Sequence, residues 1–295
     1  VLDGGLAGQE NSRGNPFGQL GVQEFRVLTQ NYKAEYEQAG AAIITAITKS
    51  GTNQFHGEGF FSYTGKKLSE KDYFNKVRDL PKPDFKREQY GAALGGPIIK
   101  DKLFFFVSYE GNDQDRAQNV ILGNRTPENV ARFGQYEGSF VSPFREDLYF
   151  GKLTFTPNDV QRFDVSFNRR KETDIQGFGG QTARTAAENK NNTVDTYNFK
   201  WTYNDGDTLN EFRASYLSYV YNPTSLNPED PTYVYRGVIT FGGKNSSQRI
   251  VQDSYTLRDD LTLNQFAGHT IKTGVKLSWQ DYEFNKLFYV QPEFT

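Results

Sequence analysis

The stretch Tyr197-Asn-Phe-Lys-Trp-Thr-Tyr203 alternates strictly between aromatic and polar side chains. Successive side chains of a β-strand point to opposite faces, so this stretch predicts a strand with one aromatic face and one hydrated face. The same period of two recurs elsewhere and selects Tyr149, Leu153, Phe155, Phe163, Val165, Phe167, Ile271, Val275, Leu277 and Trp279 as apolar positions. Strands of this kind cover an apolar environment on one side only.

Composition agrees with this pattern. The 295 residues include 25 Phe, 18 Tyr and 28 Gly, yet only 36% are hydrophobic, which is low for a compact soluble core of this size. No apolar run approaches the roughly 18 residues of a membrane-spanning helix, so a helical membrane protein is excluded. The absence of Cys excludes disulfides and thiolate metal sites, and a net charge of −2 gives no basic footprint for nucleic acid.

The connections between the predicted strands alternate between short and long. Short turns rich in Pro, Asn, Asp and Gly fall near 97–101, 157–159, 204–207 and 264–268, and long polar loops fall near 64–86, 111–146, 170–191 and 222–247. Outer-membrane barrels have short periplasmic turns and long external loops. We therefore predict barrel strands at 55–64, 86–96, 102–111, 146–156, 160–170, 192–203, 208–221, 248–263 and 269–285.

Some predicted strands exceed the 9–11 residues that span a bilayer, so we expect them to project beyond it. Asp259 shares parity with apolar neighbours, and 208–221 has no clean apolar face. We expect a bulge there, or a strand end that lies outside the lipid. A β-sandwich also has alternating strands, but its strands are typically shorter and the regular alternation of loop lengths favours a barrel.

The N-terminal segment follows a different pattern. Residues 22–29 alternate like a strand, 32–38 are polar, and 41–47 form a short apolar run suited to burial on both faces. We expect a small α/β unit that packs inside something larger.

These segments carry a family resemblance. The motifs Val22-Gln-Glu-Phe-Arg-Val27, Ala34-Glu-Tyr36, Ile47-Thr-Lys-Ser-Gly-Thr-Asn53 and Phe55-His-Gly57 resemble the plug-to-barrel junction of TonB-dependent receptors. The stretch Gly95-Gly-Pro-Ile-Ile-Lys-Asp-Lys-Leu-Phe-Phe-Phe106, followed by Tyr109-Glu-Gly111, resembles the second barrel hairpin of their Oar-like branch. Residues 37–42 depart from the family pattern, so plug packing is expected to differ locally.

The resemblance implies a mainly β fold, an antiparallel transmembrane barrel of about 22 strands in the bacterial outer membrane. Residues 1–53 would be the C-terminal part of an α/β plug domain, and 54–295 the N-terminal part of the barrel. The chain starts without Met and both ends look cut, so we expect the TonB box, most of the plug and the remaining strands to lie outside it. An N-terminal regulatory-like domain, frequent in Oar-like receptors, is not visible.

The function that the resemblance implies is uptake of an unidentified ligand. The expected partners are the TonB complex, outer-membrane lipid and an external ligand, with no nucleic acid and no cofactor. Two alternatives stay open. One is a surface adhesion or secretion-linked barrel without import, and the other is a soluble β-rich binding protein, for which exposed sheet edges would be hazardous.

Two groups of residues are candidate functional sites. Lys49, Ser50, Gly51, Thr52 and Asn53 would turn the chain at the periplasmic rim between plug and barrel, or act as a hinge when the plug moves. Aromatic residues of the long loops either pack in the loops and the membrane girdle or contact a ligand. They are Tyr136, Phe140, Phe144, Phe178, Tyr233 and Tyr235.

Enzyme chemistry has little support in the sequence. His56 and His269 are the only histidines, which argues against a His-based triad and a multi-His metal site. Asp113 and Asp115 are expected to be solvated loop residues rather than cation ligands, and 177–180 is expected to be an external loop rather than a nucleotide-binding loop. We therefore predict no catalytic, cofactor-binding or metal-binding residue.

Overall fold

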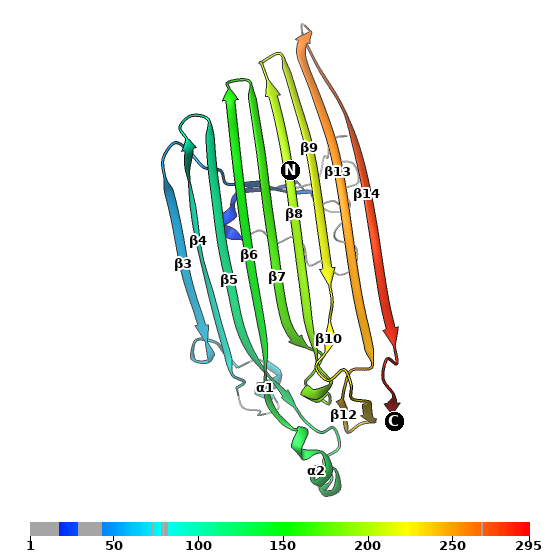
Figure 1. Cartoon of the computed structure of the whole chain (residues 1–295). Coiled ribbons are helices and arrows are strands. Elements are labelled where there is room, and N and C mark those ends of the chain that lie inside the picture. The colour runs from blue at the N-terminus through cyan, green and yellow to red at the C-terminus, as the bar shows by residue number, and fades with distance from the viewer. Residues whose placement is uncertain (1–17, 29–42, 72, 78, 80–81, 267) are drawn as a thin grey trace.

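The fold is described from a computed structural model, which defines residues 18–28, 43–71, 73–77, 79, 82–266 and 268–295. Its main feature is a sheet of nine long antiparallel strands in the spatial order β14-β13-β9-β8-β7-β6-β5-β4-β3 (Figure 1). These strands are β3 (His56–Gly65), β4 (Phe85–Ile99), β5 (Leu103–Val120), β6 (Gly138–Asn158), β7 (Gln161–Gln176), β8 (Glu188–Asn204), β9 (Thr208–Tyr221), β13 (Ser246–Phe266) and β14 (His269–Phe288). The sheet does not close on itself within the described residues, and β3 and β14 form its edges.

The two ends of the sheet differ. Short turns join the strands at one end, which is uppermost in Figure 1, and long connections with small elements of their own join them at the other. The small elements are η3 (Lys66–Leu68), α1 (Tyr73–Val77), α2 (Pro127–Phe133), η4 (Gly134–Tyr136), η5 (Arg184–Ala186), β10 (Thr224–Ser225), β11 (Thr232–Tyr235), β12 (Ile239–Gly242) and β15 (Glu293–Phe294). β10 pairs with β8, and β11 pairs with both β12 and β15.

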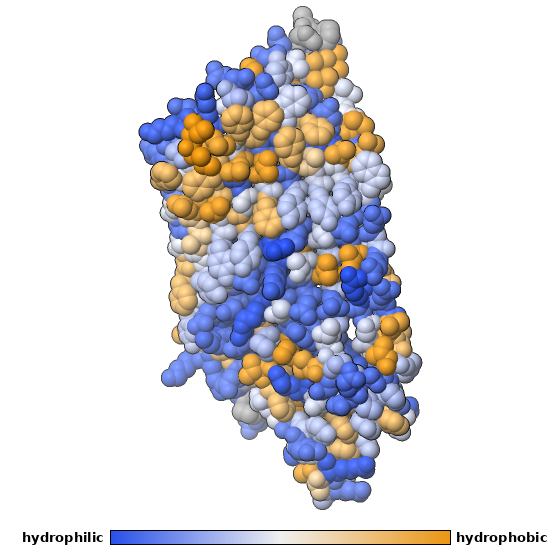
Figure 2. All heavy atoms as spheres, in the orientation of Figure 1, coloured by the Kyte–Doolittle hydropathy of each residue, from blue (hydrophilic) through white to orange (hydrophobic). Residues whose placement is uncertain are grey.

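The outer face of the sheet is the aromatic face that the alternation predicts. Strand register places Phe163, Trp201 and Phe212 in one row across the strands, and Phe167, Tyr197 and Tyr216 in another. The next row towards the long loops is charged and contains Arg169 and Asp195. Figure 2 shows this face, with apolar side chains gathered towards the short-turn end and hydrophilic ones further along the strands. An apolar row, a tyrosine-rich row and a charged row follow one another along the strands, as expected for the lipid-facing side of an outer-membrane barrel. We call the nine long strands the wall.

The inner face is polar and carries paired charges. Arg170 Nε lies 2.7 Å from Glu146 Oε1, and Glu172, only 1% exposed, binds both Arg170 and Lys190. In an apolar environment a buried charge is costly unless it is paired, so removing one member of this group would leave an uncompensated charge. The charged side chains of the inner face therefore stabilise one another, and each ion pair depends on its neighbours.

A small N-terminal unit packs on the inner face. It comprises η1 (Gln19–Gly21) and the antiparallel pair of β1 (Val22–Leu28) with β2 (Ile43–Thr48), and in Figure 1 it lies behind the long strands. Leu20 joins Ala93, Phe106 and Phe150 of the wall in one buried apolar cluster. The predicted strands at the start and end of this segment are confirmed, whereas the polar stretch 32–38 and the unusual segment 37–42 lie outside the described residues.

All nine predicted barrel strands are present, but several continue further towards the long loops than predicted. β5 reaches Val120, β6 begins at Gly138, β7 reaches Gln176 and β8 begins at Glu188. The connections predicted at 111–146 and 170–191 are therefore partly strand, and Asp113 and Asp115 lie on β5 rather than in a loop. These extensions are mainly polar, and the apolar residues at the start of β6, Phe140, Val141 and Phe144, do not alternate, so no period of two marks them.

The bulge expected near Asp259 is absent. β13 pairs with β9 in continuous register from Ile250 to Leu263, and the shift in its pairing with β14 falls later, between Leu263 and Phe266. Asp259 therefore stays on the outer face, where Asn210 Nδ2 donates a hydrogen bond of 3.0 Å to its carboxylate. A neighbouring amide, rather than a backbone irregularity, accommodates the carboxylate.

Candidate functional site

The segment Lys49–Asn53 joins β2 to the start of the barrel wall and makes close contact with it. A Cβ atom placed on Gly51 would lie 2.2 Å from the backbone oxygen of Phe105 and 2.7 Å from that of Gly96. Gly96 also lacks room for a side chain, because its Cβ would lie 2.4 Å from the Phe55 ring. The two glycines thus let the connecting chain cross directly against β4 and β5.

Asn53 fixes the next step of this connection to the first short turn. Its Oδ1 accepts a 2.8 Å hydrogen bond from the backbone N–H of Asp101, and its Nδ2 donates to the Asp101 carboxylate. Asp101 has a φ of +63°, a left-handed conformation that Asp and Asn tolerate better than most residues. Thr52 Oγ1 donates to the backbone oxygen of Gln54 at 2.9 Å and tightens the same turn.

Cationic side chains of the wall reach the connection from the inner face. Lys152 Nζ on β6 donates to Thr48 Oγ1 at 3.3 Å, and Arg162 Nη2 on β7 lies 3.5 Å from Ser50 Oγ. Lys49 forms an ion pair with Glu58 on β3. The connection is therefore held by side chains from three strands of the wall.

Glu110 on β5 anchors the N-terminal unit at a second point. Its Oε1 accepts a 2.7 Å hydrogen bond from the backbone N–H of Leu20, at the place where η1 meets the wall. The backbone N–H of Lys49 in turn donates to the oxygen of Gly21 at 3.0 Å. These bonds link the start of β1 and the end of β2 to one patch of the inner face.

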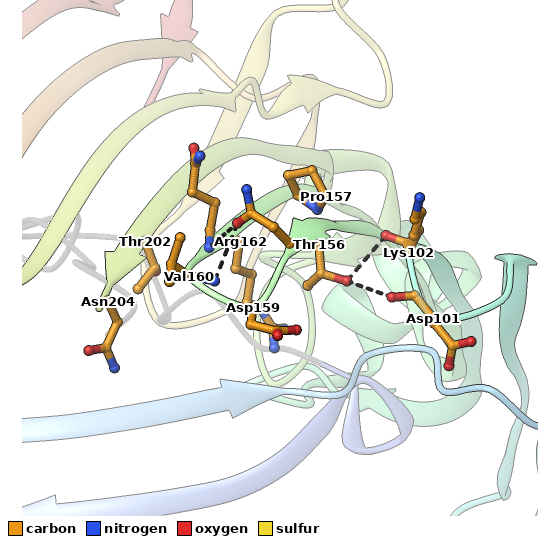
Figure 3. Close-up of a pocket in the computed structure, with 11 residues that line it drawn as sticks. Asp101, Lys102, Thr156, Pro157, Asp159, Val160, Arg162, Thr202 and Asn204 are labelled. Atoms are coloured by element: carbon orange, nitrogen blue, oxygen red, sulfur yellow. Dashed lines mark hydrogen bonds between the residues drawn. The ribbon is translucent and has the colours of Figure 1, made fainter. Parts of the chain in front are cut away.

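A pocket of about 480 Å³ opens at the short-turn end, beside this connection. It is lined by the β4–β5 turn, the β6–β7 turn and the end of β8, and Figure 3 shows Thr156 and Arg162 among its side chains. Thr156 Oγ1 donates to the backbone oxygens of Asp101 and Lys102 at 3.2 and 3.3 Å. Because Asp101, Lys102, Asp159 and Arg162 bring both signs of charge, the lining does not select one kind of ion.

The long-loop end has a packed core of its own. Val120, Leu122, Phe133, Phe178, Ala183, Ala187 and Ile239 form a buried cluster. Arg132 lies over the rings of Phe133 and Tyr235 at 5.1 and 4.9 Å and donates a 2.8 Å hydrogen bond to the Tyr235 hydroxyl. We call these residues and the elements around them, α2, η4, η5, β11 and β12, the loop cap.

Most of the predicted loop aromatics belong to this cap. Phe178 is a member of the buried cluster, and Tyr136, Phe140 and Tyr235 pack against it. Burial raises the pKa of the Tyr136 hydroxyl above its ordinary value. Tyr233 stacks between Phe241 and Phe294, at centroid distances of 5.1 and 5.4 Å. Phe144 is separate from the others, because it lies half-buried on β6 opposite Gln114 and Asp174.

The two histidines lie on opposite edges of the sheet. His56 lies at the start of β3 and His269 at the start of β14, so the structure does not bring them together. No group of three or more metal-ligating side chains occurs among the described residues. Within the same residues, no helix combines the length and the hydropathy needed to cross a membrane.

Comparisons with known proteins agree with this architecture. Residues 47–147 match the family model described as an outer membrane beta barrel domain. Over 177 residues, half of this chain, the sequence is 28% identical to the TonB-dependent transporter Oar of Myxococcus xanthus. The outer membrane transporter YddB of Escherichia coli matches 89% of the chain with a TM-score of 0.69 at 13% identity. The siderophore receptor PirA of Acinetobacter baumannii matches 90% of it with a TM-score of 0.56 at 15% identity.

The chain carries an outer-membrane barrel domain, and it is similar in sequence to a TonB-dependent transporter and in fold to outer-membrane transporters and receptors. It spans 15% of the length of Oar, 35% of YddB and 35% of PirA. Its place is the bacterial outer membrane. The soluble β-rich alternative is thereby set aside, and the apolar outer face of the sheet is explained as its lipid-facing surface.

The contacts of the barrel wall that the sequence analysis did not predict join segments that lie far apart in the sequence. Glu110 and Lys152 gave no signal, since single charged residues on a strand are common, and their partners near Leu20 and Thr48 are remote in sequence. Asn53 and Gly51 were selected as turn-forming residues, although the turn alone did not reveal their contacts with Asp101 and Phe105.

Proposed function

We propose that the protein carrying this chain imports an external ligand across the outer membrane through a plugged barrel, with energy supplied by the TonB complex. The main support for the proposal is that η1 and the Lys49–Asn53 connection both lie against the inner face of the wall and are hydrogen-bonded to it. A segment that occupies the inside of an outer-membrane barrel blocks passage until it moves. The similarity to a TonB-dependent transporter supports this direction and this energy source.

In this proposal residues 1–53 are the C-terminal part of the plug, and residues 54–295 are the N-terminal part of the barrel. Lys49–Asn53 is the fixed end of the plug, because Gly51 and Asn53 are locked to β4, β5 and their turn. Glu110 is the releasable end, since one carboxylate holds the backbone of Leu20. Movement of the plug would break the contacts of Leu20 before those of Asn53.

Ligand capture is assigned to the long-loop end. The loop cap is an ordered platform, and Tyr136, Tyr233, Tyr235 and Phe140 lie on it half-buried, with part of each ring accessible. Aromatic rings held in this way are suited to anchor a ligand at little cost in side-chain entropy.

A tether between η1 and the wall tests the proposal. A Cβ on Gly21 would lie 3.5 Å from Ser108 Oγ, which is close to the spacing that a disulfide requires. In a cysteine-free background of the full-length protein, Gly21→Cys combined with Ser108→Cys should block uptake when oxidised, and reduction should restore it. A matched disulfide within the wall, made from Asn168→Cys and Thr196→Cys, should leave uptake unchanged, because these residues are cross-strand partners.

The uptake probe is a nutrient identified by growth. In the source bacterium, deletion of the gene and deletion of tonB should abolish growth on the same nutrient. If the gene-deletion strain grows normally on every nutrient that requires tonB, import is refuted. Loss of surface attachment in that strain, with growth intact, would instead establish the adhesion alternative.

A further inference from the structure

The two cations that reach the Lys49–Asn53 connection from the wall share one carboxylate. Asp164 lies on the inner face of β7, opposite Thr154 of β6. Its Oδ1 accepts a 2.6 Å hydrogen bond from Thr154 Oγ1 and lies 3.6 Å from Lys152 Nζ. The same carboxylate accepts hydrogen bonds from Nε and Nη2 of Arg162, at 2.8 and 3.0 Å. Within the described part of the chain, Asp164 therefore bonds to the wall and not to the connection.

The pair with Asp164 fixes the plane of the Arg162 guanidinium. Two nitrogens bind the two oxygens of the carboxylate, and a planar group held at two points cannot turn freely. One of these nitrogens, Nη2, also lies 3.5 Å from Ser50 Oγ. The Arg162 side chain is 46% exposed and lines the pocket at the short-turn end, so water can replace its partners. Without Asp164, the guanidinium would therefore leave Ser50 at little cost.

Lys152 depends on Asp164 for a different reason. Its side chain is only 12% exposed, and a buried ammonium is tolerated when a carboxylate offsets its charge. Among the described residues, Asp164 is the only carboxylate within ion-pair distance of Lys152. The other charged side chains that act on Lys152 most strongly are Arg162 and Lys200, and both are cations. Without Asp164, Lys152 would turn away from these cations towards water and lose its 3.3 Å hydrogen bond to Thr48 Oγ1.

We propose that Asp164 is a positioning residue, which holds both cations on the hydroxyl groups of the connection and so sets how firmly Lys49–Asn53 lies against the wall. The inference rests on the proposed function in one respect, the description of the N-terminal unit as a plug. The hydrogen bonds of Asn53 and the ion pair of Lys49 with Glu58 do not involve Asp164. Loss of Asp164 should therefore loosen the connection and not detach it.

Hydrogen exchange of the full-length protein in lipid nanodiscs, followed by mass spectrometry, tests this role. The peptide 46–53 contains the N–H of Lys49, which donates to the backbone oxygen of Gly21 at 3.0 Å and reports whether the connection stays in place. Asp164→Asn keeps the shape of the side chain and removes its charge. Exchange in this peptide should become about fivefold faster, the factor that corresponds to about 1 kcal/mol of lost hydrogen bonding. An unchanged rate would refute the role.

Asp195 provides a matched control on the outer face of β8. Its side chain is 17% exposed and binds Arg169 through both oxygens, at 2.6 and 2.8 Å. The Arg169 side chain is 46% exposed, as that of Arg162 is. Asp195→Asn removes the same charge from the same kind of pair, but it should leave exchange in 46–53 unchanged. Equal acceleration by Asp195→Asn and Asp164→Asn would show a general weakening of the wall and overturn the proposal.

Two further variants separate positioning from folding. In a protein with Thr48→Val and Ser50→Ala, which lacks both hydroxyl groups, Asp164→Asn should add nothing to the exchange rate of 46–53. An additive increase would mean that Asp164 does not act through these hydroxyls. If Asp164→Asn does not fold, the exposed substitution Arg162→Gln decides, because it should by itself accelerate exchange about twofold. Since no measurement uses uptake, this inference can fail while import is confirmed, and it can hold if import is refuted.

Discussion

Phe199 and Lys200 provide a direct test of which face of β8 meets lipid. Phe199 lies on the outer face between Val165 and Ala214, and its ring is 6.2 Å from that of Phe212. Phe199→Arg would bring a cation into hydrocarbon, which costs about 2–4 kcal/mol near the bilayer midplane. Loss of the ring contacts adds about 1 kcal/mol. We therefore expect the free energy of unfolding to fall by about 3–5 kcal/mol.

Lys200 is the matched control on the opposite face of the same strand. Its Nζ lies 2.5 Å from Glu211 Oε1, but the side chain is 37% exposed, so this pair contributes at most about 1 kcal/mol. Glu211 keeps a second partner in Arg213, at 3.0 Å, when Lys200 is replaced. Lys200→Phe should therefore lower the free energy of unfolding by about 1 kcal/mol or less.

The assay is reversible unfolding of the full-length protein in lipid vesicles, with both variants under matched conditions. A neutral Phe199→Arg together with a severely destabilising Lys200→Phe would show that the even-numbered side chains face lipid. The register of β8 would then be wrong by one residue, because a one-residue shift moves every side chain to the other face.

Three further predictions concern the connection, the turns and the topology. Gly51→Ala should destabilise the full-length protein by about 1–3 kcal/mol in the same assay, whereas Gly151→Ala, which has open space around its Cβ, should change stability by less than about 0.5 kcal/mol. At the β8–β9 turn, the 2.8 Å hydrogen bond from the Thr208 N–H holds the pKa of the Asp205 carboxyl below its usual value. This contribution to stability is complete above about pH 4 and is lost as the pH falls, so Asp205→Ala should flatten the acid limb of a stability–pH curve. Epitope tags near positions 75, 125, 180 and 235 should be labelled on intact cells and tags near 158, 205 and 266 should not, and the reverse pattern would invert the orientation.

The sequence alone was sufficient to predict the position of each strand in the part where the strand crosses an apolar medium. The alternation around Phe163 and Phe199 has a physical cause, since one face meets hydrocarbon and the other meets polar side chains. Towards the long loops this contrast ends, because the outer face of β7 carries Arg169 and Lys171 while its inner face carries Arg170 and Glu172. A period of two gives no signal there, so the ends of β5 and β7 were predicted too early in the sequence and the starts of β6 and β8 too late.

β9 illustrates a second limit. Its outer face carries Phe212, Ala214 and Tyr216, but Leu217 and Tyr219 face inwards, so neither parity is clean. Tyr219 is 4% exposed although it lies on the polar face. Only the pairing with β8 and β13 assigns the faces of this strand, and pairing is information that one segment of sequence does not contain.

The Lys49–Asn53 connection could be predicted from its turn-forming residues, but its contacts depend on the fold. Turn-forming residues marked Gly51 and Asn53, but the closeness of Phe105 and Asp101 depends on the β4–β5 hairpin folding back beside them. The anchors at Glu110 and Lys152 depend on where the N-terminal unit crosses the inner face. The sequence can therefore indicate where the N-terminal unit meets the barrel wall before it can indicate how firmly the two are joined.

Under the proposed function, the extended strands and the loop cap together limit how a ligand would enter. Beyond the row of Arg169 both faces of the wall are hydrated, so the strands continue as a polar collar outside the lipid. The cap is built on this collar, and Ile239 and Ala187 are almost completely buried in it. Because loops with such a core are already ordered in the folded protein, they lose little further conformational entropy when a ligand binds. If this end captures the ligand as proposed, recognition would depend on the exposed edges of a preformed surface, whereas opening of the inner face would depend on the contacts of Leu20 and Glu110.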